Sequence, residues 1–327
     1  MNPFRYRRAS DPHDAVQAIS TGSKFLAGGT NLIDLMKDGV EKPEVLIDLN
    51  RAGMAVIEPL PDGGLRLGAM ARNSDTANHP EVRRRYPLLS RAILSGASPQ
   101  LRNLATNGGN LLQRTRCPYF MDPGFAQCNK RAPGTGCGAL QGINRTHAIF
   151  GASDQCIAVH PSDMCVALAA LDAVVRVQGR GGERRIPFAA FHRLPGATPQ
   201  VDTNLQPDEL VVSIDLPPSP YAARSHYLKV RDRASYEFAL VSVAAALDLE
   251  NNVIRSARIA LGGVAPKPWR AEAAERLLAG KRAGNDAFEA AAHQAVAGAR
   301  AYGQNQYKIE MARRAVALAL NQVGGAA

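Results

Sequence analysis

The stretch Leu26-Ala27-Gly28-Gly29-Thr30-Asn31-Leu32 decides the fold assignment, because two glycines join a short predicted strand to a predicted helical turn. Glycine has no Cβ, so backbone N–H groups in such a loop can approach anionic oxygens closely, and a helix N-terminus adds partial positive charge. The stretch lacks both the GxGxxG of a Rossmann site and the GxxxxGK[ST] of a P-loop. Alone, it fits a pyrophosphate site and a plain tight turn equally well.

A second loop of the same kind, Thr106-Asn107-Gly108-Gly109-Asn110, follows later in the chain. Two Gly-Gly loops flanked by Thr and Asn favour a two-sided pyrophosphate cradle over two unrelated turns. A third polar cluster, His160-Pro161-Ser162-Asp163, opens a predicted helix at Met164. Here the side chain of Ser162 or Asp163 fits a helix N-cap, and Asp163 alternatively fits an acceptor for a ribose hydroxyl.

Strand and helix patterns alternate around these loops. In the first hundred residues we predict strands at 24–27, 45–49 and 65–69 and helices at 14–19, capped by Asp11, 32–37 and 81–94. Regular patterns resume with a helix at 165–170, strands at 173–178 and 210–214, strand-like or mixed segments at 227–230, 240–249 and 253–261, and helices at 271–279, 286–301 and 307–322. The pattern predicts a mixed α/β (α+β) fold with a boundary after Pro217-Pro218, giving domains 1–220 and 221–327.

Composition limits the class of protein. The 327 residues exceed one typical domain, and 46% hydrophobic with 21% charged residues is typical of folded proteins. The net charge of +10 fits nucleic acid, an anionic cofactor or an acidic partner subunit. Because no run of 18 apolar residues and no N-terminal signal pattern occurs, we expect no membrane span, and a location in the cytoplasm or export attached to another protein.

Residues 113–156 form a long segment, rich in glycine and proline, that shows no sustained period. It holds four of the five cysteines, spaced C-x10-C-x8-C-x18-C. The odd total and the chain length argue against a disulfide scaffold, whereas four thiolates fit a zinc ion or an iron–sulfur cluster. The spacing matches neither usual zinc pairs nor a ferredoxin motif, so it leaves the metal open. Cys165, on an apolar helix face, is interpreted as a small buried residue.

The local charge of this segment favours an anionic group. Between Gln113 and His147 five basic residues face a single acid, Asp122. An iron–sulfur core with four thiolates carries negative charge, although a solvated basic loop remains an alternative.

Taken together, the two glycine loops and Pro161-Ser162-Asp163 resemble the FAD-binding medium subunits of the xanthine dehydrogenase, or molybdenum hydroxylase, family. The C-terminal stretches that share this resemblance are 229–233, 238–244, 261–265 and 267–270. The resemblance covers the whole chain. It implies a two-part N-terminal FAD-binding domain of the PCMH (vanillyl-alcohol-oxidase-like) type and a C-terminal domain of the CO dehydrogenase flavoprotein type.

The cysteine-rich stretches 112–120 and 128–131 are similar to the FAD subunit of periplasmic aldehyde oxidoreductases, which carries an additional [4Fe–4S] cluster. By position, the resemblance implies the cluster ligands Cys117, Cys128, Cys137 and Cys156. The FAD-binding residues it implies are Leu26, Ala27, Gly28, Gly29, Thr30, Asn31, Leu32, Ile33, Asp34, Thr106, Gly109, Asn110, Asp163 and Lys229.

The function implied by the resemblance is electron transfer within a heterotrimer. A large molybdenum-cofactor subunit would oxidise an aldehyde to a carboxylic acid, and a small [2Fe–2S] subunit would pass electrons to FAD on this chain and then to an external acceptor. The resemblance also implies periplasmic export with a signal-bearing partner. No catalytic triad or other separate catalytic motif is visible on this chain.

Three alternatives remain open at this stage. The chain could serve a xanthine, purine or other heterocycle hydroxylase. It could be a zinc-stabilised nucleic-acid binder, although 6% aromatic residues and one Trp give no basic aromatic stripe. It could also be an assembly subunit without flavin. We expect no nucleic-acid partner.

Overall fold

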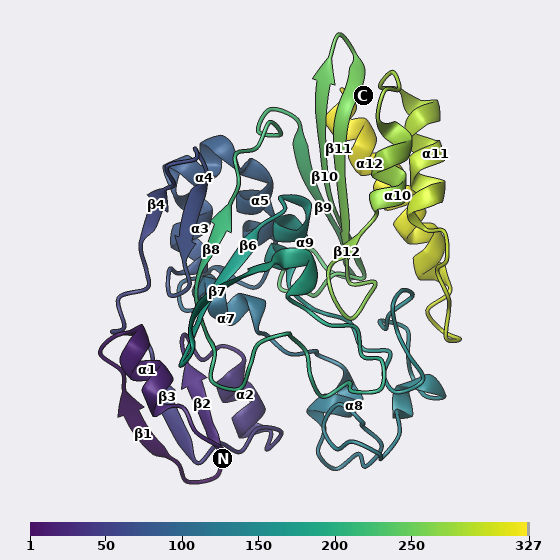
Figure 1. Cartoon of the computed structure of the whole chain (residues 1–327). Coiled ribbons are helices and arrows are strands. Elements are labelled where there is room, and N and C mark those ends of the chain that lie inside the picture. Colours follow the sequence, from purple (N-terminus) through teal and green to yellow (C-terminus); the bar gives the residue numbers. More distant parts are fainter. Residues whose placement is uncertain (326–327) are drawn as a thin grey trace.

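A small parallel sheet carries the first glycine loop in the computed structural model, which describes residues 1–325 (Figure 1). Its strands are β1 (Arg5–Arg8), β2 (Ser23–Leu26) and β3 (Val45–Asp48), in the order β1-β3-β2. Helices α1 (Pro12–Ala18) and α2 (Leu32–Lys37) follow β1 and β2. The carboxylate of Asp11 accepts a 2.8 Å bond from the backbone N–H of Asp14, which confirms the predicted cap. Strand β1 was not predicted.

A five-stranded antiparallel sheet forms the middle of the molecule. Its order is β4 (Ile57–Pro59), β5 (Leu65–Gly68), β8 (Leu210–Leu216), β6 (Val174–Gly179) and β7 (Gly182–Pro187). Strand β5 pairs with β8, with Leu65 opposite Leu216, so two distant parts of the sequence complete one sheet. Its core also takes residues from α3 (Asn73–Asn78), α4 (Pro80–Arg85), α5 (Pro87–Ser95) and α9 (Asp163–Ala170).

The predicted single helix at 81–94 is wrong, because the chain forms α4 and α5 instead. Proline has no N–H to donate and disfavours helical geometry in the residue before it. Pro87 therefore interrupts the helix, and Tyr86 adopts φ −132° and ψ 52°.

The C-terminal unit is an antiparallel sheet covered by helices. The strands are β12 (Trp269–Arg270), β11 (Val253–Gly262), β10 (Val241–Glu250) and β9 (Ser225–Val230), and the helices are α10 (Glu272–Leu278), α11 (Asn285–Ala295) and α12 (Tyr307–Gly324). Val243 and Ala245 of β10 pack in the core with these helices, whereas Ala244 packs in the core with α5 and α9. The sheet is buried on both faces, which ties the two units together. Helix α11 ends before the predicted residue 301.

The segment 113–156, called the cysteine segment below, has little regular structure, as predicted. It contains only the short helices α8 (Pro118–Met121) and η1 (Gly138–Leu140). Phe120 and Cys128 pack against Leu35 of α2, and the amides of Ile149 and Phe150 donate to Val264 O. The segment therefore connects the N-terminal sheet unit to the C-terminal unit, and Figure 1 shows α8 below β12.

Two further short helices, α6 (Pro99–Arg102) and α7 (Asn107–Leu111), lie between α5 and the cysteine segment, and η2 (Phe188–Ala190) follows β7. Within residues 1–325, no helix combines the length and apolar character needed to cross a membrane.

Candidate functional site

The first glycine loop has no room for side chains. A Cβ on Gly28 would lie 2.0 Å from Leu104 O, and Gly29 adopts φ +75°, which favours glycine. Asn31 follows at the start of α2, where its Oδ1 accepts a 2.9 Å bond from the backbone N–H of Arg114. Its Nδ2 is buried and has no partner in the protein. Because a buried donor without a partner is costly, the loop presents an amide group ready for an external acceptor.

The second glycine-rich stretch lies against the first, as predicted, but it forms a short helix and not a loop. Residues 107–111 form α7, and Thr106 caps it by accepting a 3.2 Å bond from the N–H of Gly109. A Cβ on Gly109 would lie 4.0 Å from Ala27 Cβ, so the two glycine-rich stretches approach each other closely. Since Thr106 already accepts from Gly109, this stretch offers less free backbone N–H than the sequence suggested.

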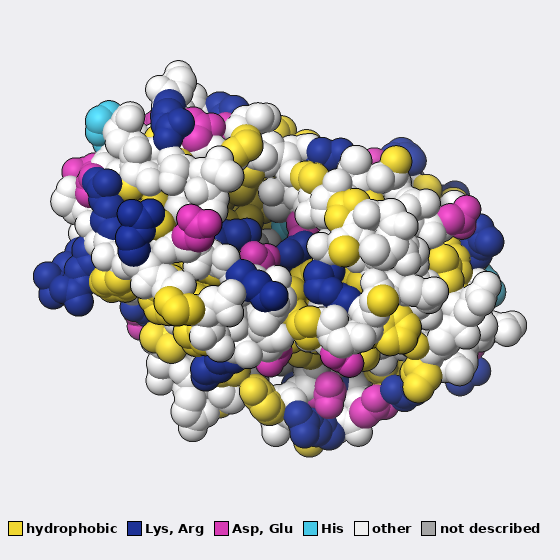
Figure 2. Space-filling model, turned by 90° about the horizontal axis from the view of Figure 1, so that it is seen from below, with side chains coloured by type: hydrophobic (Ala, Val, Ile, Leu, Met, Phe, Trp, Pro, Cys, Tyr) yellow, Lys and Arg dark blue, Asp and Glu magenta, His cyan; other side chains and the backbone are white. Residues whose placement is uncertain are grey.

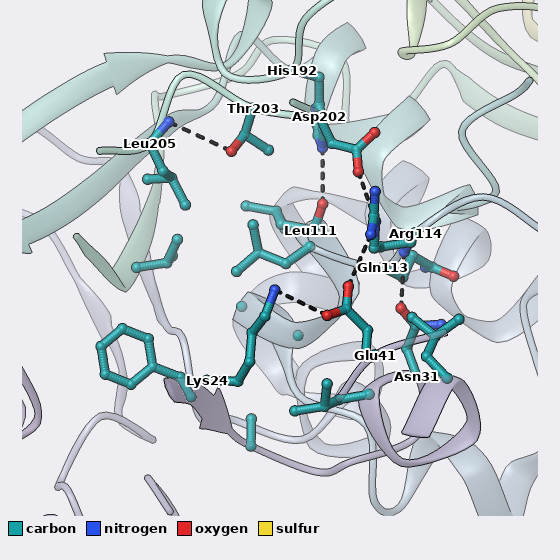
Figure 3. A pocket seen from close by; sticks show the side chains of 18 of the residues that line it. Lys24, Asn31, Glu41, Leu111, Gln113, Arg114, His192, Asp202, Thr203 and Leu205 are labelled. Carbon is teal, nitrogen blue, oxygen red and sulfur yellow. Dashed lines mark hydrogen bonds and ion pairs between the residues drawn. The ribbon is translucent and has the colours of Figure 1, made fainter. Parts of the chain in front are cut away.

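A cavity of about 540 Å³ opens beside the two glycine stretches. A chain of alternating charges crosses its wall, as Figure 3 shows: Glu41 lies between Lys24 (3.3 Å) and Arg114 (2.8 Å), and Arg114 also contacts Asp202 (3.0 Å). The face in Figure 2 is hollowed near its centre, with charged side chains gathered around the hollow. The predicted residues that line the cavity are Ala27, Gly28, Gly29, Thr30, Asn31, Leu32, Thr106 and Gly109.

A second cavity, of about 250 Å³, adjoins the first. Both cavities are lined by Thr30, Asn31 and Gly109, so they meet where the glycine stretches approach. We call the two together the two-lobed cavity. The second lobe also brings in the predicted residues Asp34, Asn110, Asp163 and Lys229. Among the predicted FAD-binding residues, all of which lie within residues 1–325, only Leu26 and Ile33 line neither lobe. A Cβ on Gly29 would lie 2.9 Å from Ile33 Cγ1, so the side chain of Ile33 packs beneath the glycine loop.

Asp163 and Lys229 form a buried ion pair in the second lobe. Lys229 Nζ lies 2.8 Å from Asp163 Oδ2, and the exposed fractions of the two side chains are 4% and 8%. The hydroxyl of Tyr227 donates to Asp163 Oδ1 at 2.7 Å, and burial raises the pKa of Tyr227. The N-cap interpretation is confirmed for Ser162, whose Oγ accepts from the N–H of Cys165 at 3.0 Å. Both oxygens of Asp163 already have partners within the protein.

Sequence reasoning missed Tyr227 as a partner of Asp163. Tyr227 and Lys229 are two apart on strand β9, so their side chains share one face of the sheet. This alternation was the available signal. Their common partner, Asp163, starts α9 in another unit, and no local pattern could have indicated that contact.

The four predicted cysteines of the cysteine segment line one small cavity, together with Tyr119 and Phe120. Cys128 and Cys137 are paired across an isolated antiparallel bridge. None of the cysteines forms a disulfide. Burial raises the pKa of Cys117 to about 12 and that of Cys156 to about 11, so both thiols keep their protons at neutral pH unless a cation binds them.

The spacing of the sulfurs bears on which metal they could hold. A tetrahedral zinc with Zn–S bonds of about 2.3 Å places its sulfurs roughly 3.8 Å apart. Within residues 1–325, three potential metal-ligand atoms lie within 4.8 Å of one another at one place, formed by His160, Cys165 and His192. This set includes none of the four cysteines of the cysteine segment. The four thiols are therefore not gathered as tightly as the ligands of a single bound zinc ion.

Cys165 lies fully buried in the central core, which confirms the interpretation of a small buried residue. Burial raises its pKa to about 12 and lowers that of the neighbouring His192 to about 4. His192 Nε2 lies 2.8 Å from Leu111 O, so this nitrogen carries the proton.

The excess of basic residues in the cysteine segment is balanced by acids from outside it. Lys130 Nζ lies 2.5 Å from Asp202 Oδ1, and Arg145 contacts Asp232 at 2.7 Å. Arg114 pairs with Glu41 and Asp202, as described above. The local charge count alone overstated the positive field around the cysteines, because these partners are distant in the sequence.

Two protein-family models match the chain and together cover most of it. Residues 2–219 match the FAD binding domain in molybdopterin dehydrogenase, and residues 226–323 match the CO dehydrogenase flavoprotein C-terminal domain.

Curated relatives and solved structures agree with these matches. The aldehyde oxidoreductase FAD-binding subunit PaoB of Escherichia coli is 51% identical over 324 residues, which cover 98% of each chain. The carbon monoxide dehydrogenase medium chain of Hydrogenophaga pseudoflava is 27% identical over 97% of this chain and 96% of its own. A solved structure of that organism's carbon monoxide dehydrogenase, which lacks the Mo-pyranopterin moiety, matches with a TM-score of 0.77 and 28% identity over 99% of this chain and 98% of the other.

Proposed function

Because the chain belongs to the FAD-binding subunits of the molybdenum hydroxylase family, we propose that it holds FAD and a [4Fe–4S] cluster within a molybdenum-dependent aldehyde oxidoreductase. The aldehyde is favoured over a purine or other heterocycle by one comparison. The relative at 51% identity is an aldehyde oxidoreductase subunit, whereas a xanthine dehydrogenase FAD-binding subunit is 26% identical over 83% of the chain.

The observation that carries the FAD proposal is the two-lobed cavity, whose lobes meet at the glycine stretches. A dinucleotide has a matching shape, because its anionic pyrophosphate lies between two ring systems. Gly28 and Gly29 line the cavity, so their backbone could lie against the pyrophosphate, and the unpartnered Nδ2 of Asn31 would donate to it. Asp163 and Lys229 would place a fixed pair of charges beside the ring in the second lobe. Bound FAD supplies the redox chemistry, while these residues position it.

The cluster proposal rests on four cysteines that line one cavity, of which Cys128 and Cys156 are buried and Cys117 and Cys137 are partly buried. Cys117, Cys128, Cys137 and Cys156 would hold the cluster, which supplies one-electron redox chemistry. Its bonds would also cross-link a segment that has little secondary structure to order it. We favour this clamping role, because the electron route from [2Fe–2S] centres to FAD does not require the additional cluster.

The proposed partners are a large molybdenum-cofactor subunit and a small [2Fe–2S] subunit. Exposed apolar side chains at the second lobe support docking there: Tyr236 and Phe238 line the lobe and keep 55% and 44% of their surface exposed. We also propose that electrons leave FAD for an external acceptor and that the complex reaches the periplasm with a signal-bearing partner. Cell fractionation of the coexpressed subunits tests the location, and recovery in the cytoplasm alone would contradict it.

Anaerobic titration of the purified complex with substrate tests the proposed function. We expect an aldehyde to bleach the flavin absorbance of the complex, whereas xanthine leaves it unchanged. Iron analysis should give about four irons for this chain, the content of one [4Fe–4S] cluster, beyond those of the [2Fe–2S] subunit. Bleaching by xanthine and not by aldehydes would move the chain to the heterocycle hydroxylases.

A further inference from the structure

His147 lies directly against one of the four cysteines. Its Nε2 is 3.2 Å from Cys117 Sγ, and its side chain is almost completely buried, with 3% of the residue exposed. His147 and Cys117 also line a cavity of about 180 Å³ that reaches Asp163 and Phe238. This histidine therefore stands between the cysteine cavity and the second lobe of the two-lobed cavity.

The surroundings of the imidazole select which nitrogen carries the proton. His147 Nδ1 is buried and has no partner. A buried N–H without an acceptor is rarer in proteins than an unsatisfied acceptor, so the proton belongs on Nε2. A thiolate bound to a metal has no proton and can only accept. The arrangement therefore provides an N–H donor directed at the sulfur of Cys117.

The C-terminal helix fixes the position of this histidine. Lys308 of α12 is completely buried, and its Nζ donates to Thr146 O (3.1 Å), His147 O (2.9 Å) and Gly263 O (2.5 Å). Asn305 Nδ2 adds a bond to His147 O at 3.3 Å. The backbone that carries the imidazole is thus held in place by residues far along the chain.

We propose that His147 is a positioning residue that donates a hydrogen bond to Cys117 Sγ and thereby raises the reduction potential of the cluster. Hydrogen bonds to cluster sulfurs stabilise the more negative reduced state, and such neighbours tune metal sites generally. The inference rests on the proposed function, since it requires a cluster at the four cysteines.

Redox titration followed by EPR tests the proposal on the complete complex. H147L removes the donor, whereas H147Q keeps an N–H donor on a side chain of similar length. We expect the midpoint of the [4Fe–4S] signal to become more negative in H147L and to stay near the wild-type value in H147Q, with the flavin midpoint unchanged in both. An unchanged midpoint in H147L, or equal shifts in the two variants, would overturn the proposal.

A second measurement uses the wild-type complex, so its result does not depend on whether the His147 variants fold. Pulsed EPR of the reduced complex labelled with ¹⁵N-histidine should reveal a weak nitrogen coupling from the donor imidazole. No histidine coupling, or the strong coupling of a coordinated nitrogen, would refute hydrogen bonding as the role of His147. Absence of any [4Fe–4S] signal in the wild type would instead refute the proposed cluster, so the two failures are distinguishable.

Discussion

The two-lobed cavity and the cysteine cavity are built in opposite ways. Regular elements shape the first: β2, α2 and α7 hold the glycine stretches, and β9 and α9 supply Lys229 and Asp163. The second lies in a segment with only two short helices. Backbone geometry therefore defines the two-lobed cavity before any ligand binds, whereas in the cysteine cavity the proposed cluster would supply cross-links that secondary structure does not. Four predictions follow this contrast, in descending order of expected effect.

Removing one cysteine ligand should have the largest effect. We expect C128S to lose nearly all iron from this chain, and most FAD with it, because Cys128 packs with Phe120 against Leu35 of α2, which lines the two-lobed cavity. The control is C165A, which changes a buried cysteine outside the cysteine segment and should keep both cofactors. Iron and flavin analysis of the purified complexes measures this. An assembled C128S complex with full FAD and altered acceptor preference would instead assign the cluster a relay role.

Breaking the buried pair in the second lobe comes next. K229M leaves Asp163 charged, buried and without its cation, which costs about 3–5 kcal/mol. We expect a lower unfolding midpoint and weaker flavin retention in K229M. R255M is the control, because the Arg255–Glu250 pair is exposed at 61% and 62% and should matter little. Equal behaviour of the two variants in thermal unfolding would show that the Asp163–Lys229 pair contributes nothing.

Adding a methyl group at Gly28 should lower stability less than K229M does, but it should specifically weaken FAD binding. In G28A the new Cβ would meet Leu104 O at 2.0 Å, so the glycine loop must move away from the backbone of Leu104 and Ala105, which leads into the second glycine stretch. We expect a loss of about 1–3 kcal/mol, typical of overpacking, together with reduced flavin content. G181A is the matched control, since no atom lies within 4 Å of its Cβ position. Full flavin occupancy in G28A would contradict the cradle assignment.

The smallest effect is a pH dependence from the buried His192. Burial lowers its folded pKa from 6.5 to about 4, so the unfolded chain binds this proton more readily. Its contribution to stability is complete above pH 6.5 and is lost as the pH falls from 6.5 toward 4. We expect the denaturant midpoint to fall less between pH 7.5 and pH 5 in H192Q than in the wild type. A steeper fall of the denaturant midpoint in H192Q than in the wild type would contradict the expected loss of His192's stabilising contribution at low pH.

The sequence could predict features that depend on neighbouring residues. Asp11 caps α1 and Leu32–Lys37 forms α2 because the deciding residues are adjacent. The glycine stretches and the clustering of four cysteines were recognisable for the same reason. The interruption at Pro87 was also a local signal, and the prediction of one helix at 81–94 overlooked it.

Features that depend on distant contacts could not be predicted. The pairing of Asp163 with Tyr227 and Lys229 joins α9 to β9, and the acids that balance Lys130 and Arg145 lie outside the cysteine segment. The helical form of residues 107–111 depends on the cap by Thr106 and on packing against Ala69, whose Cβ lies 3.1 Å from a Cβ position on Gly108. Tertiary packing overrides the weak helix propensity of two glycines there.

Anomalous diffraction at the iron edge from crystals of the complex would locate both proposed cofactors at once. We expect an iron peak within this chain between Cys117, Cys128, Cys137 and Cys156, and FAD density with its pyrophosphate between the two glycine stretches. A zinc-edge peak in place of iron, or a metal at His160, Cys165 and His192 with the four cysteines empty, would contradict this expectation.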